Sequence, residues 1–207
     1  MGTYRYPFVA REGWLYLVGT IALALTLHLF SWQLAVPAWL AVIWLFIVFR
    51  DPPRKIPSIP LAIVSPIDGK VLAVEQEYDA HLKRQALCIV IKMRWYDVYS
   101  LRSPTEGKIA RAWISRADKD NSPSAILWIQ TDEKDDVVAA IFGGFWWWKP
   151  TCETQSGERV GQGQRCGFMR FGSKVVLMLP KSALARVKPG DKVDSGESII
   201  ANLIHKS

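Results

Sequence analysis

Histidine and cysteine are scarce in this chain of 207 residues, with three of each. Cys88, Cys152 and Cys166 are odd in number and lack the C-x-x-C spacing that is typical of a metal or redox site. We therefore expect no metal site. The thiols are expected to be buried or reduced, which fits a domain that faces the cytosol.

Nucleic-acid motifs are also absent, although the formal net charge is +7. The lysines and arginines are scattered along the chain, so nucleic acid is not expected as a partner. The positive charge instead indicates an anionic surface, such as a membrane or a phosphate headgroup.

Charge is almost missing from Gly13 to Phe49, where His28 is the one side chain that could carry charge near neutral pH. The stretch consists of two apolar runs, residues 13–30 and 34–49, separated at residues 31–33. A membrane-spanning helix needs about 20 apolar residues. The whole stretch is therefore too long for one ordinary span and slightly short for two.

Basic residues flank this stretch on both sides, with Arg5 and Arg11 before it and Arg50, Arg54 and Lys55 after it. Because basic residues favour the cytoplasmic side, both ends are expected there. This predicts a transmembrane helical hairpin, fully spanning or re-entrant, that anchors a cytoplasmic domain to the cell membrane. The alternative, a cleaved signal peptide, needs a small-residue cleavage site, whereas a second apolar run follows here.

Helical periodicity is nearly absent after residue 50, where short β-branched runs alternate with Gly, Pro and Asp. The prolines at 52 and 53 prevent a helix from continuing, so residues 1–55 are interpreted as anchor and linker and 56–207 as a β domain. Only Ser182–Ala185 suggests a short helical turn. The expected strands are Gly69–Val74, Ala86–Met93, Lys108–Ile114, Ala125–Gln130, Val137–Phe142, Arg165–Phe171, Lys174–Leu179 and Ser198–Leu203.

Two sequence patterns indicate how these strands fold. Ser65–Val71 recurs as Ser103–Ile109, and in both a Pro-x-acid-Gly turn leads into a strand, which predicts two equivalent strand starts in a folded-over sheet. Gly190 and Gly196 flank Val193 in a turn-strand-turn that is similar to biotinyl and lipoyl barrel-sandwich domains. We therefore expect a mainly β, barrel-sandwich-like antiparallel domain. The lysine motif of the carrier domains is absent, so a carrier role is not expected.

Gly172-Ser173 can undergo a reaction that most bonds in a turn cannot. A serine hydroxyl can attack its own preceding carbonyl when the backbone is firmly held, and the resulting ester can eliminate to dehydroalanine. Hydrolysis then leaves an N-terminal pyruvoyl group. From the residues alone, a plain turn is the simpler interpretation.

Four segments resemble, in the same order, the signatures of short-form phosphatidylserine decarboxylases: Phe49–Arg54, Val64–Val71, Arg170–Val175 and Gly190–Glu197. The resemblance covers about residues 46–203. It implies cleavage between Gly172 and Ser173 and conversion of Ser173 to a covalent pyruvoyl cofactor. The products are a large chain of residues 1–172 and a small chain of residues 173–207.

The implied reaction is decarboxylation of phosphatidylserine, or a related phosphoserine lipid, to phosphatidylethanolamine. The pyruvoyl carbonyl binds the headgroup amine and accepts electrons as CO2 leaves. Asp68 matches the family aspartate that works with a histidine in self-cleavage. The implied partners are the phospholipid, the membrane and the two chains themselves, and a homodimer is compatible with the sequence.

Tyr99 stands where the family has its histidine, within Asp97-Val98-Tyr99. Its unperturbed pKa of about 10 makes it a poor base near neutral pH, but it can donate a proton, or act as a base if a cation lowers its pKa. His81 and His205 are weak substitutes. Two hypotheses remain: an active decarboxylase with an altered acid or base, and a non-catalytic homologue that binds phospholipid or a protein.

Trp146, Trp147 and Trp148 are a second departure from the family, which usually has an Ala-Arg-Arg-like stretch here. Tryptophan favours the membrane–water interface, so this run either dips towards lipid or fills the core. The asparagine-rich signature expected near residues 118–123 is also not evident.

Overall fold

A computed structural model describes residues 8–114, 122–143, 151–152, 154–169 and 174–204. Two compact units divide the chain, one within residues 4–53 and the other from residue 54 onward. Gly172, Ser173, His205 and the Trp146–Trp148 run lie outside the described residues.

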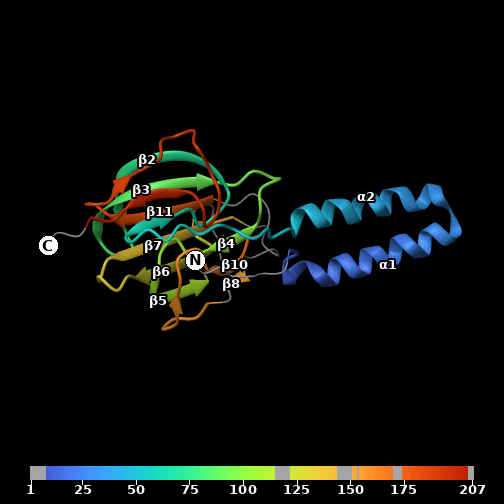
Figure 1. The fold of residues 1–207 in the computed structure, drawn as a ribbon, viewed down its shortest axis with the longest axis horizontal. Helices are drawn as coiled ribbons and strands as arrows, with labels where there is room; N and C mark the ends of the chain where they lie inside the picture. Colours follow the sequence, from blue (N-terminus) through green and yellow to red (C-terminus); the bar gives the residue numbers. More distant parts are fainter. Residues whose placement is uncertain (1–7, 115–121, 144–150, 153, 170–173, 205–207) are drawn as a thin grey trace. The chain divides into compact units, whose positions relative to one another are not determined.

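The first unit is a helical hairpin, which confirms the predicted helix pair (Figure 1). A short 3-10 turn, η1 (Arg11–Gly13), leads into α1 (Trp14–Phe30), and α2 (Trp32–Val48) follows directly. Ser31 alone makes the turn, with an extended backbone at φ −162° and ψ 126°. Helix α2 therefore starts two residues earlier than the sequence predicted.

Small residues let the two helices approach closely, since Ala24 and Ala35 are buried in the hairpin. A Cβ on Gly13 would lie 2.3 Å from the Phe49 ring, so only glycine fits there. By contrast, Leu29 is 87% exposed on α1.

One helix, Arg11–Phe30, is long and apolar enough to cross a membrane, while Trp32–Val48 is shorter. In the apolar part of Arg11–Phe30 only 17% is buried, whereas the core helix of a soluble protein is mostly buried. The exposed apolar surface of the hairpin is therefore suited to lipid.

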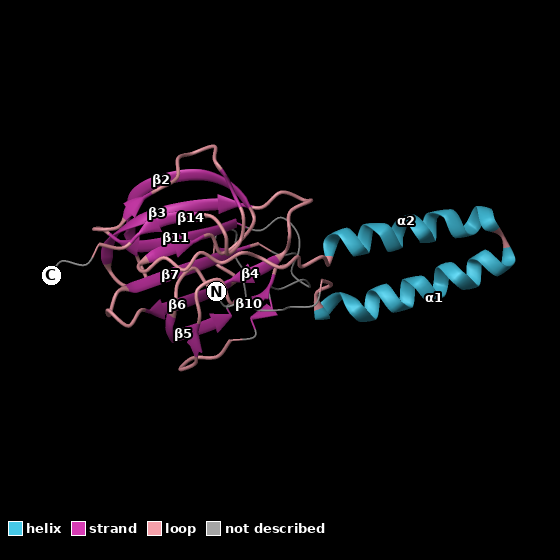
Figure 2. Cartoon of the chain, in the orientation of Figure 1, coloured by secondary structure: helices cyan, strands magenta, loops and turns pink. Residues whose placement is uncertain are grey.

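The second unit is mainly β, as predicted, and every strand pairing in its described part is antiparallel (Figure 2). Its strands are β1 (Ala62–Val64), β2 (Gly69–Asp79), β3 (Arg84–Lys92), β4 (Ser100–Arg102), β5 (Gly107–Ile114), β6 (Ala125–Gln130), β7 (Asp136–Phe142), β8 (Thr151–Cys152), β9 (Arg159–Val160), β10 (Arg165–Phe168), β11 (Lys174–Pro180), β12 (Leu184–Ala185), β13 (Lys192–Val193) and β14 (Ile199–Asn202).

Three sheets organise these strands. The largest runs in the order β13-β2-β3-β11-β7-β6-β5-β9, and two three-stranded sheets have the orders β1-β14-β12 and β4-β10-β8. One face of the large sheet fills the core with fully buried side chains, each worth roughly 1.5–3 kcal/mol of burial. These side chains include Ile89, Ile91, Ile109, Leu127, Ile129 and Ile141.

The repeated sequence forms two equivalent strand starts, which confirms that prediction. Ser65 Oγ donates to the Ile67 carbonyl at 2.6 Å, and Ser103 Oγ donates to the Thr105 carbonyl at 2.6 Å. The large sheet has the same symmetry: β13, β2, β3 and β11 correspond to β9, β5, β6 and β7.

The glycine that ends each Pro-x-acid-Gly turn is required by a close approach of the next strand. A Cβ on Gly69 would lie 2.4 Å from the Lys92 carbonyl oxygen, and one on Gly107 would lie 2.3 Å from that of Gln130. Either substitution would push the paired strands apart.

The helical turn predicted over Ser182–Ala185 is wrong. Leu184–Ala185 form β12, which pairs with Asn202 and Ala201 of β14. A two-residue strand is too short to display an alternating pattern, and its partner lies far along the chain. The predicted strand around Val193 is confirmed as β13, between Gly190 and Gly196, which have φ values of +103° and +75°.

Candidate active site

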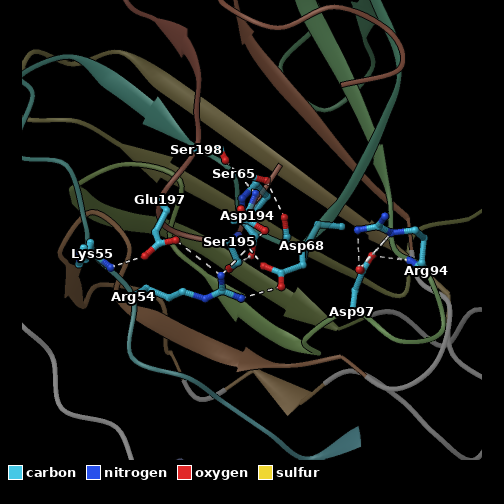
Figure 3. Close-up of polar contacts among 12 residues, drawn as sticks. Arg54, Lys55, Ser65, Asp68, Arg94, Asp97, Asp194, Ser195, Glu197 and Ser198 are labelled. Atoms are coloured by element: carbon cyan, nitrogen blue, oxygen red, sulfur yellow. Dashed lines mark hydrogen bonds and ion pairs between the residues drawn. The ribbon is translucent and has the colours of Figure 1, made fainter. Parts of the chain in front are cut away.

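Asp68 immediately precedes β2, and both of its carboxylate oxygens accept hydrogen bonds. Oδ2 accepts one from Arg54 Nη2 and Oδ1 one from the Ser195 backbone N–H, each at 2.6 Å. Asp68 is 6% exposed, and the Arg54 side chain is 10% exposed. Figure 3 shows the two side chains meeting beside the turn that carries Ser195.

Two turns hold Asp68 in this position. Ser195 Oγ donates to the Pro66 carbonyl at 3.1 Å, and the Gly196 N–H donates to the Ser65 carbonyl at 2.8 Å. The C-terminal turn is therefore fixed against the turn that precedes β2, and the carboxylate lies between them.

Arg54 also links Asp68 to other acids. Its Nη1 lies 3.7 Å from Glu197 Oε2 and 4.0 Å from Asp194 Oδ1. The Lys55 backbone N–H donates to Glu197 Oε1 at 2.6 Å. These contacts attach residues 54–55 to the C-terminal turn (Figure 3).

Burial raises the pKa of Asp68 above its ordinary value of 3.8, and the Arg54 guanidinium and the Ser195 N–H oppose this rise without cancelling it. A carboxylate with a raised pKa is a stronger base than one exposed to water. Asp68 is therefore suited to accept a proton.

The other half of the domain shows what is special about Asp68. Glu106 occupies the corresponding place before β5, but its side chain is exposed. The two halves share the turn and the glycine, whereas only the first buries its acid. The backbone symmetry alone therefore does not explain the burial of Asp68.

Tyr99 immediately precedes β4 and is 1% exposed. Its hydroxyl donates to the Trp95 carbonyl at 2.6 Å. Burial raises the pKa of Tyr99 above its ordinary value of about 10, and the Asp97 carboxylate raises it further. A pKa lowered by a cation, which would have made Tyr99 a base, is therefore not found, and the phenol is protonated at neutral pH.

Asp97 shapes the loop that leads to Tyr99. Its Oδ2 accepts a hydrogen bond from the Arg94 backbone N–H at 2.8 Å, and its Oδ1 lies 2.8 Å from Arg94 Nη2 (Figure 3). This double contact closes a turn over residues 94–97.

Gly172-Ser173 lies on the connection between two sheets, because β10 belongs to the β4-β10-β8 sheet and β11 to the large sheet. Both ends of this connection are fixed. The Met169 N–H donates to the Tyr99 carbonyl at 2.7 Å, and Lys174 pairs with Lys92 and Phe142.

Asp68 and Tyr99 make separate hydrogen bonds. The carboxylate oxygens of Asp68 are bonded to Arg54 and Ser195, whereas the hydroxyl of Tyr99 is bonded to Trp95. Their segments are nonetheless adjacent, because the Arg102 N–H, three residues after Tyr99, donates to the Pro66 carbonyl at 2.9 Å.

His81 lies in the turn between β2 and β3, where its backbone N–H bonds Asp79 Oδ1 at 2.8 Å. Lys174, the residue after Ser173, pairs with Lys92 at the other end of β3. Since β3 has nine residues, its ends are roughly 26 Å apart. His81 therefore does not replace the missing histidine.

Comparison with known proteins shows the family of this chain. The profile of the family described as phosphatidylserine decarboxylase matches residues 43–201. The chain belongs to the phosphatidylserine decarboxylase family. The chain is 37% identical over 209 residues to a phosphatidylserine decarboxylase proenzyme of Nitrosomonas eutropha, with 96% of each chain covered.

Other relatives are similar to the same extent. The proenzyme of Nitrosomonas europaea is 36% identical over 209 residues, and that of Burkholderia pseudomallei strain 1106a is 36% identical over 211 residues. The matches cover 96% and 97% of this chain, respectively, and the same shares of those proteins.

Sequence reasoning missed Arg54 and Ser195 as partners of Asp68, and Glu197 as a partner of Arg54. Arg54 lies in the segment interpreted as a linker with flanking positive charge, although it closes the first motif that resembles the decarboxylase family. Ser195 and Glu197 belong to the last such motif. The signal that could have found these contacts is the set of four family-like motifs, because residues from separate motifs can meet in one site of the fold.

Arg54→Met is expected to reduce the free energy of unfolding by about 3 kcal/mol at pH 7, because it leaves the Asp68 carboxylate buried without its cation. Without Arg54, the pKa of Asp68 rises further above 3.8. The loss should therefore be small below pH 4, grow as the pH rises from the pKa of Asp68 in the parent to the higher pKa in the variant, and be level above that. Urea unfolding of the full chain in detergent, followed by circular dichroism in a Ser173→Ala background, measures this.

The matched control is Arg159→Met. Arg159 and Asp132 also form an ion pair of 2.6 Å, but the side chains are 69% and 58% exposed. Loss of this exposed ion pair should reduce the free energy of unfolding by less than about 1 kcal/mol. Equal losses in the two variants would contradict the importance of burial at Asp68.

Proposed function

We propose that this protein is a self-cleaving, pyruvoyl-dependent decarboxylase that converts phosphatidylserine to phosphatidylethanolamine. The proposal depends above all on the position of Gly172-Ser173, in a connection between two sheets that is fixed at Met169 and Lys174. Backbone held at both ends suits attack of a hydroxyl on its own preceding carbonyl.

In the proposed cleavage, Ser173 Oγ attacks the Gly172 carbonyl carbon and its proton passes to Asp68. The peptide C–N bond breaks, leaving an ester and a free amine on residue 173. Removal of the Cα proton then breaks the Cβ–Oγ bond and releases Gly172 as a carboxylate. Water hydrolyses the resulting enamine, with loss of ammonia, to the pyruvoyl group.

The pyruvoyl group would supply an electron sink for the loss of CO2 from the headgroup. Asp68 and its ion pair with Arg54 would hold and transfer protons beside it. Tyr99, being protonated, would position its loop through the hydrogen bond to the Trp95 carbonyl rather than act as the base that the family histidine provides.

The strand pairings support a lasting association of the two cleaved chains. In the proposed small chain, β11 pairs with β3 and β7, β13 with β2, and β14 with β1. Each of these partners belongs to the large chain. Cutting the backbone before residue 173 removes none of these pairings, so we expect the chains to remain bound without a covalent link.

The helical hairpin supports a membrane location for this enzyme. Its apolar side chains are exposed along α1 and α2, and basic residues flank both ends of the hairpin. We propose that it anchors the domain on the cytoplasmic face of the cell membrane, where a phospholipid substrate is within reach.

A non-catalytic, lipid-binding or protein-binding homologue is the second candidate. One observation favours it: Tyr99, in the place of the histidine, is buried and has a raised pKa. On this alternative, Gly172-Ser173 remains uncut.

The test is the intact mass of the purified full chain after incubation at a series of pH values. We expect a blocked, pyruvoyl-type peptide of residues 173–207, formed faster as the pH rises through the pKa of Asp68, which lies above 3.8. The rate should then be level near pH 6.5, where a histidine would titrate. A chain that stays uncut at every pH, with lipid present, would establish the non-catalytic alternative.

A further inference from the structure

Four lysines form a continuous row across the large sheet. Lys192 of β13 pairs with Lys70 of β2, Lys70 pairs with Lys92 of β3, and Lys92 pairs with Lys174 of β11. Directly paired residues point to the same face of a sheet. The row therefore presents four ammonium groups on one face, at the end of the sheet where Lys174 begins β11; Figure 1 shows β2, β3 and β11 side by side.

No carboxylate among the described residues forms an ion pair with this lysine row. Lys70, Lys92 and Lys192 are exposed, and Lys174 Nζ lies 4.6 Å from the centre of the Phe142 ring. Like charges that face each other across strands destabilise a sheet. The row therefore has an electrostatic cost that no carboxylate in the described chain offsets.

The symmetry of the domain supplies an internal comparison. The corresponding row in the other half is Arg159, Lys108, Gln130 and Asp136. In that row Asp136 provides an acid, and Arg159 is paired with Asp132 at 2.6 Å. The fold therefore does not require four cations in this position.

Exposed aromatic residues follow the lysine row. The loop after Lys92 carries Trp95, which is 73% exposed, and Tyr96, which is 42% exposed, with their rings in edge contact at 5.3 Å. Arg94 lies 4.7 Å from the centre of the Tyr96 ring. Tryptophan and tyrosine beside cations are typical of surfaces that contact the membrane–water interface.

We propose that the lysine row and the Trp95–Tyr96 loop form a docking surface for an anionic phospholipid bilayer, separate from the helical anchor. Anionic lipid provides the charge that the lysines lack, and its interface accommodates the two rings. Docking would bring Lys174, the residue after Ser173 in the sequence, to the headgroups. The inference deepens the proposed function but does not require cleavage, so either can fail alone.

The experiment uses a fluorescent reporter in the loop. Tyr96→Cys is labelled with an environment-sensitive dye in the full chain, in a Cys152→Ser background that leaves the buried Cys88 and Cys166. The chain is placed in nanodiscs of phosphatidylcholine, with and without about a third of phosphatidylglycerol. We expect the emission to shift to shorter wavelength only with phosphatidylglycerol, and to revert in high salt.

Lys70→Gln, Lys92→Gln and Lys192→Gln together should lower the ratio of lipid-inserted to water-exposed label by about a hundredfold, or about fivefold for each lysine. The matched control neutralises Lys83, Lys134 and Lys181, three exposed lysines in turns at the opposite end of the sheet. This control should retain the shift. Both triple variants keep Lys174, and uncleaved Ser173→Ala should shift as the parent does.

Three results would overturn the proposal. The first is an equal shift in neutral and anionic nanodiscs, which would mean that the loop inserts without the lysines. The second is equal loss of the shift in both triple variants, which would reduce the effect to net charge. The third is a shift caused by inorganic phosphate in neutral nanodiscs, which would identify a phosphate site instead of a bilayer surface.

Discussion

Ser173→Ala is expected to leave the protein as one uncut chain of 207 residues, whereas the parent yields residues 173–207 as a separate peptide. Alanine has no oxygen to attack the Gly172 carbonyl, so neither the ester nor the pyruvoyl group can form. The effect is complete, since alanine has no leaving group on Cβ and cannot become that group. Intact mass and denaturing gels measure the cleavage, and release of CO2 from phosphatidylserine measures the activity.

Two controls distinguish lost chemistry from lost structure. Ser182→Ala alters an exposed serine just after the C-terminal end of β11, and this variant should cleave as the parent does. Ser173→Cys restores a nucleophile, so hydroxylamine should cut that variant at residue 173 through its thioester, but not Ser173→Ala. Cleavage of Ser173→Ala at the same bond would show that another nucleophile or a protease cuts the chain.

Tyr99→His should accelerate self-cleavage by about 10²–10⁴-fold near neutral pH, because imidazole is a far better base there than a phenol with a raised pKa. The histidine should also add a second inflection near pH 6.5 to the rate profile. Half-times of cleavage, measured for freshly purified chains across pH, give both quantities.

Tyr99→Phe shows whether the Tyr99 hydroxyl only positions its loop or also transfers a proton during cleavage. The Tyr99 hydroxyl already donates to the Trp95 carbonyl at 2.6 Å, so its loss should reduce stability by about 1 kcal/mol. If Asp68 is the base, this variant should cleave at nearly the parent rate, whereas Asp68→Asn should not cleave. A Tyr99→Phe chain that folds and stays uncut would instead make the phenol the proton donor. Equal half-times for the parent and the histidine variant would mean that position 99 has no part in the reaction.

Local patterns predicted the strands well where they were long enough to display alternation. Ala125–Gln130 was predicted with its observed bounds, and β2 was predicted but continues to Asp79. The strands that escaped prediction have two or three residues and gain their stability from a distant partner, as β1 does from β14. Such short strands have no pattern of their own.

The candidate site also has a part that local sequence predicts and a part that it does not. Local sequence is sufficient to propose Asp68, Tyr99 and the Gly172-Ser173 bond as site residues, because each lies in a short, distinctive run. Neither the Arg54–Asp68 pair nor the Ser195 N–H bond could be predicted, because their partners are separated in sequence and meet only when the C-terminal turn packs on the turn before β2.

The sequence by itself determined the apolar hairpin, the β class, the repeated turn and the family, because each depends on residues that are close together in the chain. Only the tertiary structure decided the environment of each charge. It buried Asp68 while leaving the corresponding Glu106 exposed, and it aligned lysines from four distant segments into one row. Burial and strand register set pKa values and surface charge, and both depend on which segments come together when the chain folds.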